Sequence, residues 1–276
     1  NAIKFYRKAA EIGDLEATKS LGDCYYNGNG VIQDYSKAIE YYEKAYEMGE
    51  LDVSSKLGQC FYSGQGINKN YEKALKYFEQ SIKHGDTNVF EPIGEIYLHG
   101  GYGIEPNYAK SNEYFERAAQ LGNPEAIKHL GYSYFKGIGV EQDYSKAIEY
   151  FMQAENFGDT QVFEPIGIIY LNGGFGVDQY YPKAVEYLER AAEHGSLYAI
   201  KALGDCYYNG QGVKKDIKKA IKYYKESYAK GNYDVSVILG FCYANGEGVT
   251  KDYQKAVFYL NKAKTLKNVE AIEKLG

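Results

Sequence analysis

The chain has 276 residues, with 32 Lys and Arg against 37 Asp and Glu and a net charge of −5. Hydrophobic residues make up 45% and charged residues 25%, values typical of folded proteins that exclude an intrinsically disordered chain. The acidic balance argues against a nucleic-acid-binding protein, which would carry a basic stripe. No apolar run approaches the roughly 18 residues of a membrane helix. We therefore expect neither nucleic acid nor direct membrane insertion among its interactions.

A repeat of 36 or 37 residues runs through the chain. Each copy carries a Leu-Gly or Ile-Gly pair, and in the first seven copies an aromatic residue follows four positions after the Leu or Ile. The pairs begin at Leu21, Leu57, Ile93, Leu130, Ile166, Leu203, Leu239 and Leu275. A Gly-rich element follows, then a Lys-Ala pair in most copies and an aromatic pair. A fixed period of this length predicts stacked repeats that are stabilised mainly by their neighbours.

Each copy predicts two helices. In the first copy, apolar residues at three- and four-residue spacing, such as Leu21 and Tyr25, predict a helix from about Leu15 to Asn27. Gly28 ends it, because glycine adopts the positive φ of a helix C-terminus at little cost. The second helix begins near Asp34, whose side chain caps the free backbone donors. Six of the seven copies have Asp or Asn at this position.

The second helix is predicted to bury a stripe made of Ala38, Tyr41, Tyr42 and Ala45. Small residues allow two helices to approach closely, and aromatic rings from the partner helix fill the space that they leave. One tyrosine occupies the same place in all seven copies, at Tyr41, Tyr77, Tyr114, Tyr150, Tyr187, Tyr223 and Tyr259.

These motifs resemble those of the Sel1-like repeat family, relatives of the tetratricopeptide repeat with a longer, Gly-rich loop between the helices. The segment "AIKALGDCYYNGQGVKKDIKKAIKYYKESYAKG" carries the family's Leu-Gly helix, its Gly-x-Gly-Val loop and its second helix ending in Gly. The resemblance covers the whole chain. It implies an all-α fold, a right-handed α-solenoid of helix-turn-helix repeats with the first helices on the concave side. Residues 1–276 would form one solenoid domain of about seven complete repeats, with a partial repeat at each end.

Copies three and five depart from the others. Each carries a proline inside the predicted first helix, Pro92 or Pro165, and one extra glycine in the loop. A proline inside a helix removes a hydrogen bond, and it bends the helix or delays its start. Two interpretations remain open, a duplication of two repeats without functional consequence and a local change of curvature that shapes the groove.

The residue types needed for catalysis are not found in the required patterns. Cys24, Cys60, Cys206 and Cys242 occupy one equivalent position, and we expect buried, inert thiols, because adjacent repeats lie too far apart for a disulfide or a zinc site. The four histidines form no metal-binding pair, and the Gly-rich loops lack the spacing of a phosphate-binding loop. We predict no catalytic residue, no cofactor and no metal, and hence no enzyme.

The resemblance places variable residues of the first helices on the concave groove. Their mixture of aromatic, charged and amide side chains is typical of a surface that binds a peptide or a protein. The predicted groove residues are Asp23, Tyr26, Tyr62, Glu95, His99, Lys128, Tyr132, Phe135, Ile168, Asn172, Lys201, Asp205, Tyr208 and Phe241.

We therefore predict a non-catalytic scaffold or adaptor that binds a protein or peptide partner in this groove. Alternatives that the family suggests are a regulatory subunit, a secreted effector, and a weak β-lactamase-like amide hydrolase. The groove residues could also be ordinary solvated helix faces, and the ends of the array offer a route to self-association. The sequence assigns no cellular compartment.

Overall fold

The computed structural model describes residues 2–265, and these residues fold as α-helices joined by short loops. Fifteen α-helices and two short 3₁₀ helices lie in this range, with two isolated β-bridges and no strand. The predicted all-α class of helix-turn-helix repeats is confirmed. The chain divides into two compact units, unit 1 (residues 1–141) and unit 2 (residues 142–276), and each is described by itself.

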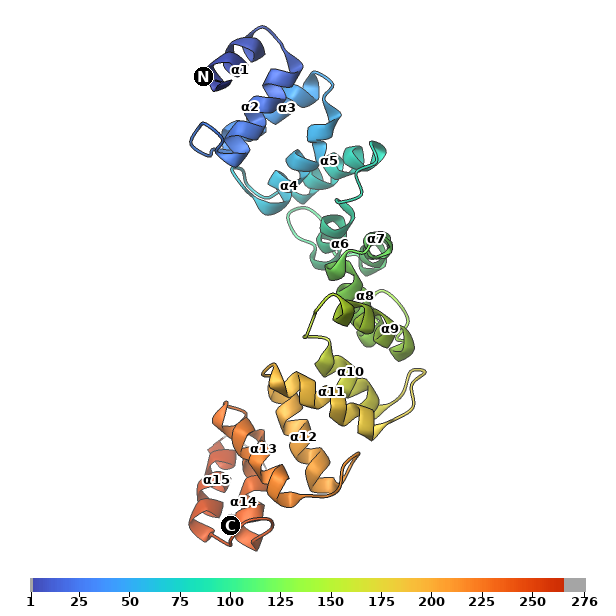
Figure 1. Ribbon diagram of the computed structural model, residues 1–276, viewed down its shortest axis with the longest axis vertical. Helices are drawn as coiled ribbons and strands as arrows, with labels where there is room; N and C mark the ends of the chain where they lie inside the picture. The colour runs from blue at the N-terminus through green and yellow to red at the C-terminus, as the bar shows by residue number, and fades with distance from the viewer. Residues whose placement is uncertain (1, 266–276) are drawn as a thin grey trace. The chain divides into compact units, whose positions relative to one another are not determined.

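The helix after the Leu-Gly pair and the helix after the Gly-rich loop alternate along the chain (Figure 1). The first helices are α2 (Leu15–Asn27), α4 (Ser54–Ser63), α6 (Phe90–His99), α8 (Pro124–Lys136), α10 (Phe163–Asn172), α12 (Leu197–Asn209) and α14 (Ser236–Asn245). The second helices are α3 (Tyr35–Glu47), α5 (Tyr71–Lys83), α7 (Tyr108–Gln120), α9 (Tyr144–Asn156), α11 (Tyr181–Glu193), α13 (Ile217–Ala229) and α15 (Tyr253–Thr265). A further helix, α1 (Ala2–Glu11), precedes them and packs on α2.

Within each unit the helices pack as antiparallel hairpins, for example α2 with α3 in unit 1 and α12 with α13 in unit 2. Helix α8 is the last helix of unit 1 and packs on α7, and α9 is the first helix of unit 2 and packs on α10. Whether the repeats form one continuous domain stays a prediction. The expected partial repeat around Leu275 lies outside the described residues.

The second helices begin where the cap residues predict. Asp34 accepts a hydrogen bond from the backbone nitrogen of Lys37 at 3.0 Å, and the five equivalent Asp and Asn residues do the same. Tyr180 has no side-chain cap, and Pro182 occupies the first turn of α11 instead. Gly28 ends α2 with φ of +74°, a left-handed conformation that favours glycine.

The glycine of the Leu-Gly pair is the contact point of each hairpin. A Cβ atom added to Gly22 would lie 2.6 Å from the ring of Tyr42, and one added to Gly204 would lie 2.5 Å from the ring of Tyr224. These rings are completely buried. Glycine is therefore required here by close packing, since any side chain would overlap the aromatic residue of the second helix.

The buried aromatic residue is the one after the tyrosine that recurs in every copy. Tyr42 is 0% exposed, whereas Tyr41 is half-buried and packs against the edge of the same cluster, so the predicted stripe is completely buried only at Ala38, Tyr42 and Ala45. Tyr41 instead stacks on Tyr25 of the first helix, with ring centroids 5.6 Å apart.

The lysine of the Lys-Ala motif lies over the outer face of the first-helix tyrosine in this stacked pair. Lys37 lies over the ring of Tyr25, with its Nζ 5.4 Å from the centroid, and Lys219 lies over the ring of Tyr207 at 4.0 Å. Lysines at this position in four other copies also lie over the equivalent ring. A cation over an aromatic face stabilises the pair by about 0.5–1 kcal/mol at an exposed site.

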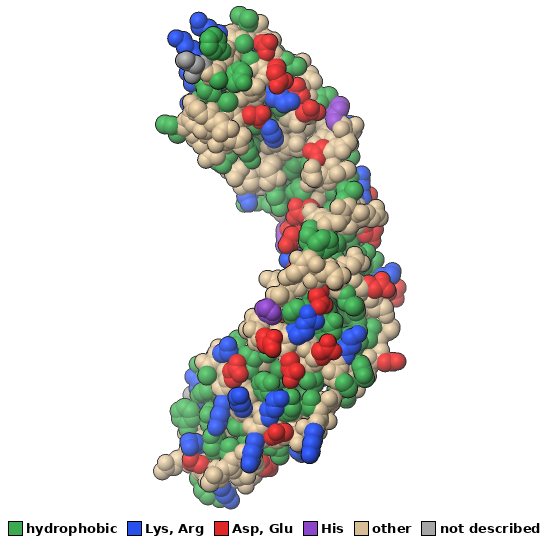
Figure 2. All heavy atoms as spheres, viewed as in Figure 1, with side chains coloured by type: hydrophobic (Ala, Val, Ile, Leu, Met, Phe, Trp, Pro, Cys, Tyr) green, Lys and Arg blue, Asp and Glu red, His purple; other side chains and the backbone are tan. Residues whose placement is uncertain are grey.

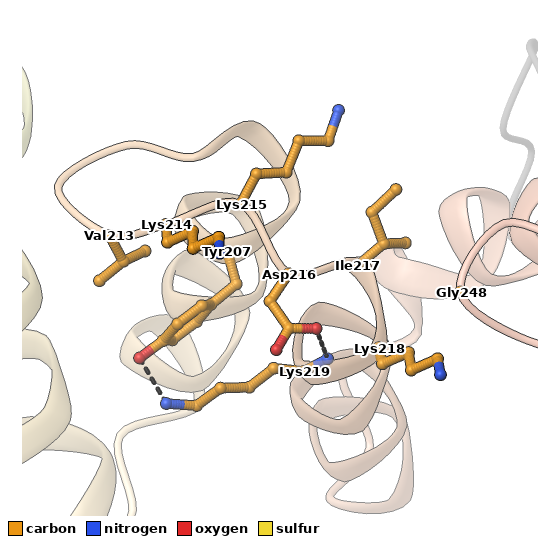
Figure 3. Close-up of a pocket in the computed structure, with 9 residues that line it drawn as sticks. All are labelled: Tyr207, Val213, Lys214, Lys215, Asp216, Ile217, Lys218, Lys219 and Gly248. Carbon is orange, nitrogen blue, oxygen red and sulfur yellow. Dashed lines mark hydrogen bonds between the residues drawn. The ribbon is translucent and has the colours of Figure 1, made fainter.

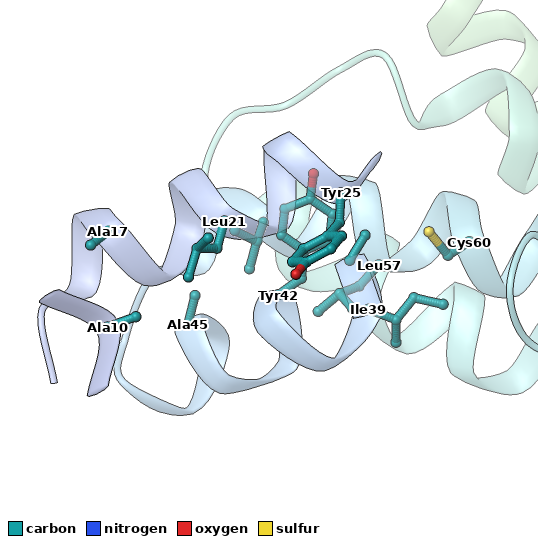
Figure 4. Packing of buried hydrophobic residues seen from close by; sticks show 11 residues of the cluster. Ala10, Ala17, Leu21, Tyr25, Ile39, Tyr42, Ala45, Leu57 and Cys60 are labelled. Atoms are coloured by element: carbon teal, nitrogen blue, oxygen red, sulfur yellow. The ribbon is translucent and has the colours of Figure 1, made fainter. Parts of the chain in front are cut away.

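Apolar clusters extend from one hairpin to the next. In unit 1 a single cluster joins Ala10 of α1, Leu21 of α2, Tyr42 of α3 and Leu57 of α4, as Figure 4 shows. A repeat of this size cannot bury its apolar residues alone, so each hairpin depends on its neighbours.

The loops also touch the preceding repeat. A Cβ atom added to Gly66 would lie 2.5 Å from the Cβ of Tyr35, and Ser36 donates a hydrogen bond to the carbonyl of Gly66 at 2.7 Å. In the two longer loops an aromatic residue makes this contact, because Tyr102 packs edge-on against Tyr71 with centroids 5.0 Å apart. Tyr102 adopts φ of +49°, a conformation that is uncommon for a residue with a side chain.

The two prolines lie in the first turn of their helices, whereas we expected them in the interior of a longer helix. Helix α6 begins at Phe90 and Pro92 is its third residue, a position whose backbone N–H would have no acceptor inside the helix, so the donor that proline lacks is not missed. Helices α4 and α14 begin at the equivalent position without any proline. The four late-starting helices share a buried valine just before the helix, and the other three have alanine there and begin three residues earlier. Proline is therefore not needed for the late start.

Candidate functional site

The first helices follow one another along one side of each unit, and their surface directed away from the second helices is here named the first-helix face. All fourteen predicted groove residues belong to first helices. Eight are in unit 1 and six in unit 2. Twelve are half-buried, and His99 and Asn172, the last residues of α6 and α10, are exposed. Half-burial leaves these side chains accessible and yet held by neighbours.

In unit 1, Asp23 joins three helices. Its carboxylate accepts a hydrogen bond from the hydroxyl of Tyr42 on α3 at 2.7 Å, and it is paired with the ammonium of Lys56 on α4. Lys56 also lies over the ring of Tyr42, 5.3 Å from its centroid. Burial, followed by the bond to Asp23, raises the pKa of Tyr42. An acid, a cation and an aromatic ring therefore link two consecutive first helices.

The same arrangement recurs around Glu95 on α6. Its carboxylate oxygens lie 2.7 Å from Nε2 of His129 on α8 and 3.2 Å from Nε2 of His99. The ring of His129 stacks on Phe115, with centroids 4.6 Å apart and planes 4° from parallel. The hydrogen bond from His129 holds the pKa of Glu95 below its usual value.

Glu91 lies one turn before Glu95 on α6, and its pKa is shifted in the opposite direction. It is half-buried, and burial together with the negative charge of Glu95 raises its pKa. A carboxylate that is ionised in such surroundings lowers the stability of the folded state. Glu91 therefore marks a place where a partner that supplies a cation or a hydrogen-bond donor would be favoured.

In unit 2 the corresponding acid is Asp205 on α12. It accepts a hydrogen bond from the hydroxyl of Tyr224 at 2.8 Å, and it pairs with Lys201 one turn earlier at 2.8 Å. The next first helix has Ile238 where Lys56 and His129 stand in unit 1, so no cation reaches Asp205 from that helix. Tyr208 instead extends to the next repeat and donates a hydrogen bond to Glu247 at 3.0 Å.

A hollow of about 250 Å³ opens on the first-helix face of unit 1. Its wall includes Tyr26 of α2, Lys56 and Gln59 of α4, Asn88 of the segment that leads into α6, and Pro92 in the first turn of α6. Aromatic and apolar surface is combined there with amide and ammonium groups, the mixture found where a peptide side chain is bound.

The remaining predicted residues are held mainly by local contacts. Lys128 pairs with Glu125 on its own helix at 2.7 Å, and Tyr62 stacks on Tyr71, where burial raises its pKa to about 12. Tyr132 lies beneath the ammonium of Lys136, and Phe241 packs against the cluster of Val237, Leu260 and Ala263. Phe135 of α8 and Ile168 of α10 are half-buried.

The prediction did not include Lys56 and His129 among the groove residues, although both contact predicted acids. Each stands directly before the Leu of the Leu-Gly pair in its own helix, and the acid that it contacts, Asp23 or Glu95, stands two residues after the Leu or Ile of the preceding pair. The signal was therefore a pairing across one repeat length, between the position two after Leu and the position one before the next Leu.

The cysteines are poor nucleophiles. Cys60, Cys206 and Cys242 are buried, and burial raises the pKa of each thiol to about 11. Burial also raises the pKa of the half-buried Cys24. Thiolate, the reactive form, is therefore scarce at neutral pH. Among residues 2–265, no group of three or more His, Cys, Asp or Glu side chains is arranged to hold a metal ion.

No helix in the described part of the chain combines the length and the apolar character that crossing a membrane requires.

The fold and the first-helix face define an α-helical repeat protein of the solenoid class. The family model for the Sel1 repeat matches eight segments, residues 1–14, 15–50, 55–86, 93–123, 124–155, 166–196, 197–232 and 237–268. The chain therefore belongs to the Sel1 repeat family, whose members generally mediate protein–protein interactions and are generally non-catalytic.

Two solved structures are similar to nearly the whole chain. One is a protective antigen of uropathogenic Escherichia coli with an SLR fold, at 26% identity and a TM-score of 0.72; the match covers 98% of this chain and 57% of the antigen. The other is a Sel1 repeat protein from Oxalobacter formigenes, at 29% identity and a TM-score of 0.63, covering 99% of this chain and 78% of that protein. This chain thus spans little more than half the length of the E. coli antigen. No curated protein matches it.

Proposed function

We propose that this protein is a non-catalytic scaffold that binds a peptide or an extended segment of a partner protein on its first-helix face. The observation that carries the proposal is the hollow beside Tyr26 in unit 1, which exposes aromatic, amide and ammonium groups of three successive elements. A bound segment that follows this face would meet Tyr26 and Gln59 first and then the carboxylates of Glu91 and Glu95.

The side chains of this face favour a partner segment that combines an apolar residue with a basic one. The half-buried ring of Tyr26 offers apolar surface for one anchoring side chain, beside the buried Pro92. A few such anchors carry most of the binding energy of an interface. Glu91, whose pKa is raised, gains most from a cation, so a Lys or Arg next to the anchor is expected. The face of unit 2, around Ile168, Asp205 and Tyr208, is proposed as a second contact region for the same class of partner.

The test uses a random peptide library displayed on phage and selected on the full chain. A selected peptide, labelled with a fluorophore, is then titrated against two matched variants, Gln59→Arg on α4 and Gln80→Arg on α5. Both make the same chemical change, but only Gln59 lines the hollow. We expect Gln59→Arg to weaken binding about tenfold, since it fills the hollow, and Gln80→Arg to leave it unchanged.

Equal binding to the wild-type chain and to Gln59→Arg would contradict the proposal, and so would selective loss with Gln80→Arg. Circular dichroism of both variants establishes that they remain folded. The double variant Tyr132→Ala and Phe135→Ala tests the face at α8 in the same assay, with loss of binding as the expected result.

A further inference from the structure

Helix α13 has lysines on its exposed face at positions where most of the other second helices have glutamates. Six residues after the cap, four of the other six second helices have Glu, and α13 has Lys222. Nine residues after the cap, four of the others again have Glu, and α13 has Lys225. Two residues after the cap, α13 has Lys218, which no other copy has. Packing does not require these lysines, since the same fold is built with Glu at two of the positions.

The lysines of this segment have no carboxylate partner. Lys214, Lys215, Lys218, Lys222 and Lys225 make no ion pair with any residue in the described part of the chain. Lys215 and Lys225 lie over the rings of Tyr208 and Tyr243, 5.7 and 5.3 Å from the centroids, contacts that leave their charges without a counter-ion. Lys219 is different, because it also bonds the hydroxyl of Tyr207, whose ring it covers. The basic patch is therefore defined as Lys214, Lys215, Lys218, Lys222 and Lys225, and its charges are not neutralised internally. Figure 2 shows blue side chains gathered where Figure 1 places α13.

The charge of the chain is divided unevenly. Residues 197–276 contain fourteen Lys against eight Asp and Glu, a net charge of +6, whereas residues 1–196 carry a net charge of −11. A local excess of one sign steers the approach of a partner with the opposite sign.

A hollow of about 750 Å³ adjoins the patch at the start of α13 (Figure 3). Lys214, Lys215 and Lys218 stand at its edge, and Val213 and Ile217 provide apolar surface. The ring of Tyr207, the cap residue Asp216, Lys219 and Gly248 of the following loop complete the lining, so that one carboxylate stands among four ammonium groups. An apolar side chain can be bound here while the flanking residues of the same ligand meet the ammonium groups.

Carboxylates limit the extent of the patch. Glu189 and Glu193 of α11 and Glu226 of α13 line a neighbouring hollow of about 420 Å³. A nucleic-acid strand or an anionic membrane surface that spread beyond the lysines would meet these acids, whereas a short segment would not. We propose that the basic patch of α13 binds a short acidic segment of a partner protein, rich in Asp and Glu, with one apolar residue seated in the hollow beside Ile217.

The experiment measures binding of a fluorescent acidic peptide, alternating Asp and Glu around a single Leu, to the full chain by anisotropy. The test variant is Lys222→Glu/Lys225→Glu, which introduces the residue type that other repeats carry at these positions and is therefore expected to fold. The control variant, Lys76→Glu/Lys83→Glu on α5, changes the net charge by the same amount at another site. Single-stranded oligothymidine and vesicles containing phosphatidylserine serve as competing anions.

We expect the peptide to bind the wild-type chain and the control variant equally, and the test variant at least about tenfold more weakly. Raising the salt concentration from about 0.05 M to about 0.5 M should weaken binding, because the charges are exposed. Replacing the Leu of the peptide by Ser should also weaken it. The proposal is overturned if the peptide does not bind, if both variants weaken it equally, or if oligothymidine or the vesicles bind more tightly. A change in the oligomeric state of the chain alone, caused only by the test variant, would assign the patch to a second copy and would also overturn it.

Discussion

Replacing Gly94 by alanine tests the packing that joins the two helices of each hairpin. A Cβ atom at Gly94 would lie 2.6 Å from Cε1 and 2.7 Å from Cδ1 of Phe115, well inside van der Waals contact. The ring cannot move away easily, because it is fully buried and His129 stacks on it at 4.6 Å. Ser111 of α7 also donates a hydrogen bond to the carbonyl of Gly94 at 2.9 Å, which fixes the distance between the helices.

Two effects of opposite sign determine the result. Alanine favours the helical state over glycine by about 1 kcal/mol. Overpacking of a closely packed core costs about 1–3 kcal/mol, and the rigid surroundings of Phe115 place this site at the upper end. We therefore expect Gly94→Ala to lower the free energy of unfolding by about 2 kcal/mol.

Urea unfolding followed by circular dichroism measures this change. The matched variant is Gly94→Ala/Phe115→Leu, in which the second helix carries the smaller side chain that faces Gly167 in unit 2 as Leu188. A Cβ atom at Gly167 would lie 3.0 Å from Leu188, so leucine reduces the overlap without abolishing it. Adding Gly94→Ala to Phe115→Leu should therefore cost less stability than adding it to the wild-type chain. If Gly94→Ala raised the urea midpoint, helix propensity alone would describe the site, and close approach of the helices would be refuted as the reason for glycine.

The remaining predictions concern titrating groups. Glu91→Gln should stabilise the protein at pH 7, because the raised pKa of Glu91 means that ionisation opposes folding; the gain should disappear as the pH falls below the ordinary glutamic acid value of 4.5. Glu95→Gln should destabilise it at pH 7, since the pKa of Glu95 is lowered, and that loss should disappear only below the lowered pKa. Urea midpoints as a function of pH measure both, and effects of the same sign would refute the electrostatic assignment. At pH 8, a thiol reagent should label Cys60, Cys206 and Cys242 slowly in the native protein and rapidly in urea, because their pKa values are near 11; rapid native labelling of Cys60 would contradict its burial.

Much of the fold follows from local sequence rules. The bounds of α2 and the start of α3 agree with prediction, because a side-chain cap and a glycine with positive φ act within one turn of the residues that encode them. It was harder to predict which residue of the second helix is completely buried. Tyr41 and Tyr42 both lie on the inner side of the helix, and only the close approach of Gly22 selects Tyr42 for complete burial.

The late starts of α4 and α14 were missed for a related reason. Proline was the only helix-breaking signal considered, whereas both helices begin late with a buried valine and no proline. Whether a residue at this point is helical depends on how Val53 or Val235 packs against the neighbouring repeat, which a single copy of the repeat does not encode.

For the candidate site, the sequence predicted the helices and the acids but not their partners. Asp23 and Glu95 were predicted to face the groove, and the structure adds that each is bonded to a nitrogen of the next first helix, Nζ of Lys56 or Nε2 of His129. Such pairs span one repeat length and depend on the stacking of hairpins. They could be found only by comparing positions one repeat apart.

Hydrogen–deuterium exchange of the full chain with and without a phage-selected peptide tests the central claim most directly. The account predicts slower exchange with the peptide bound in the first helices, led by α4 and the segment 86–92 that borders the hollow, with unchanged exchange in α5 and α7. Protection confined to the second helices would contradict it.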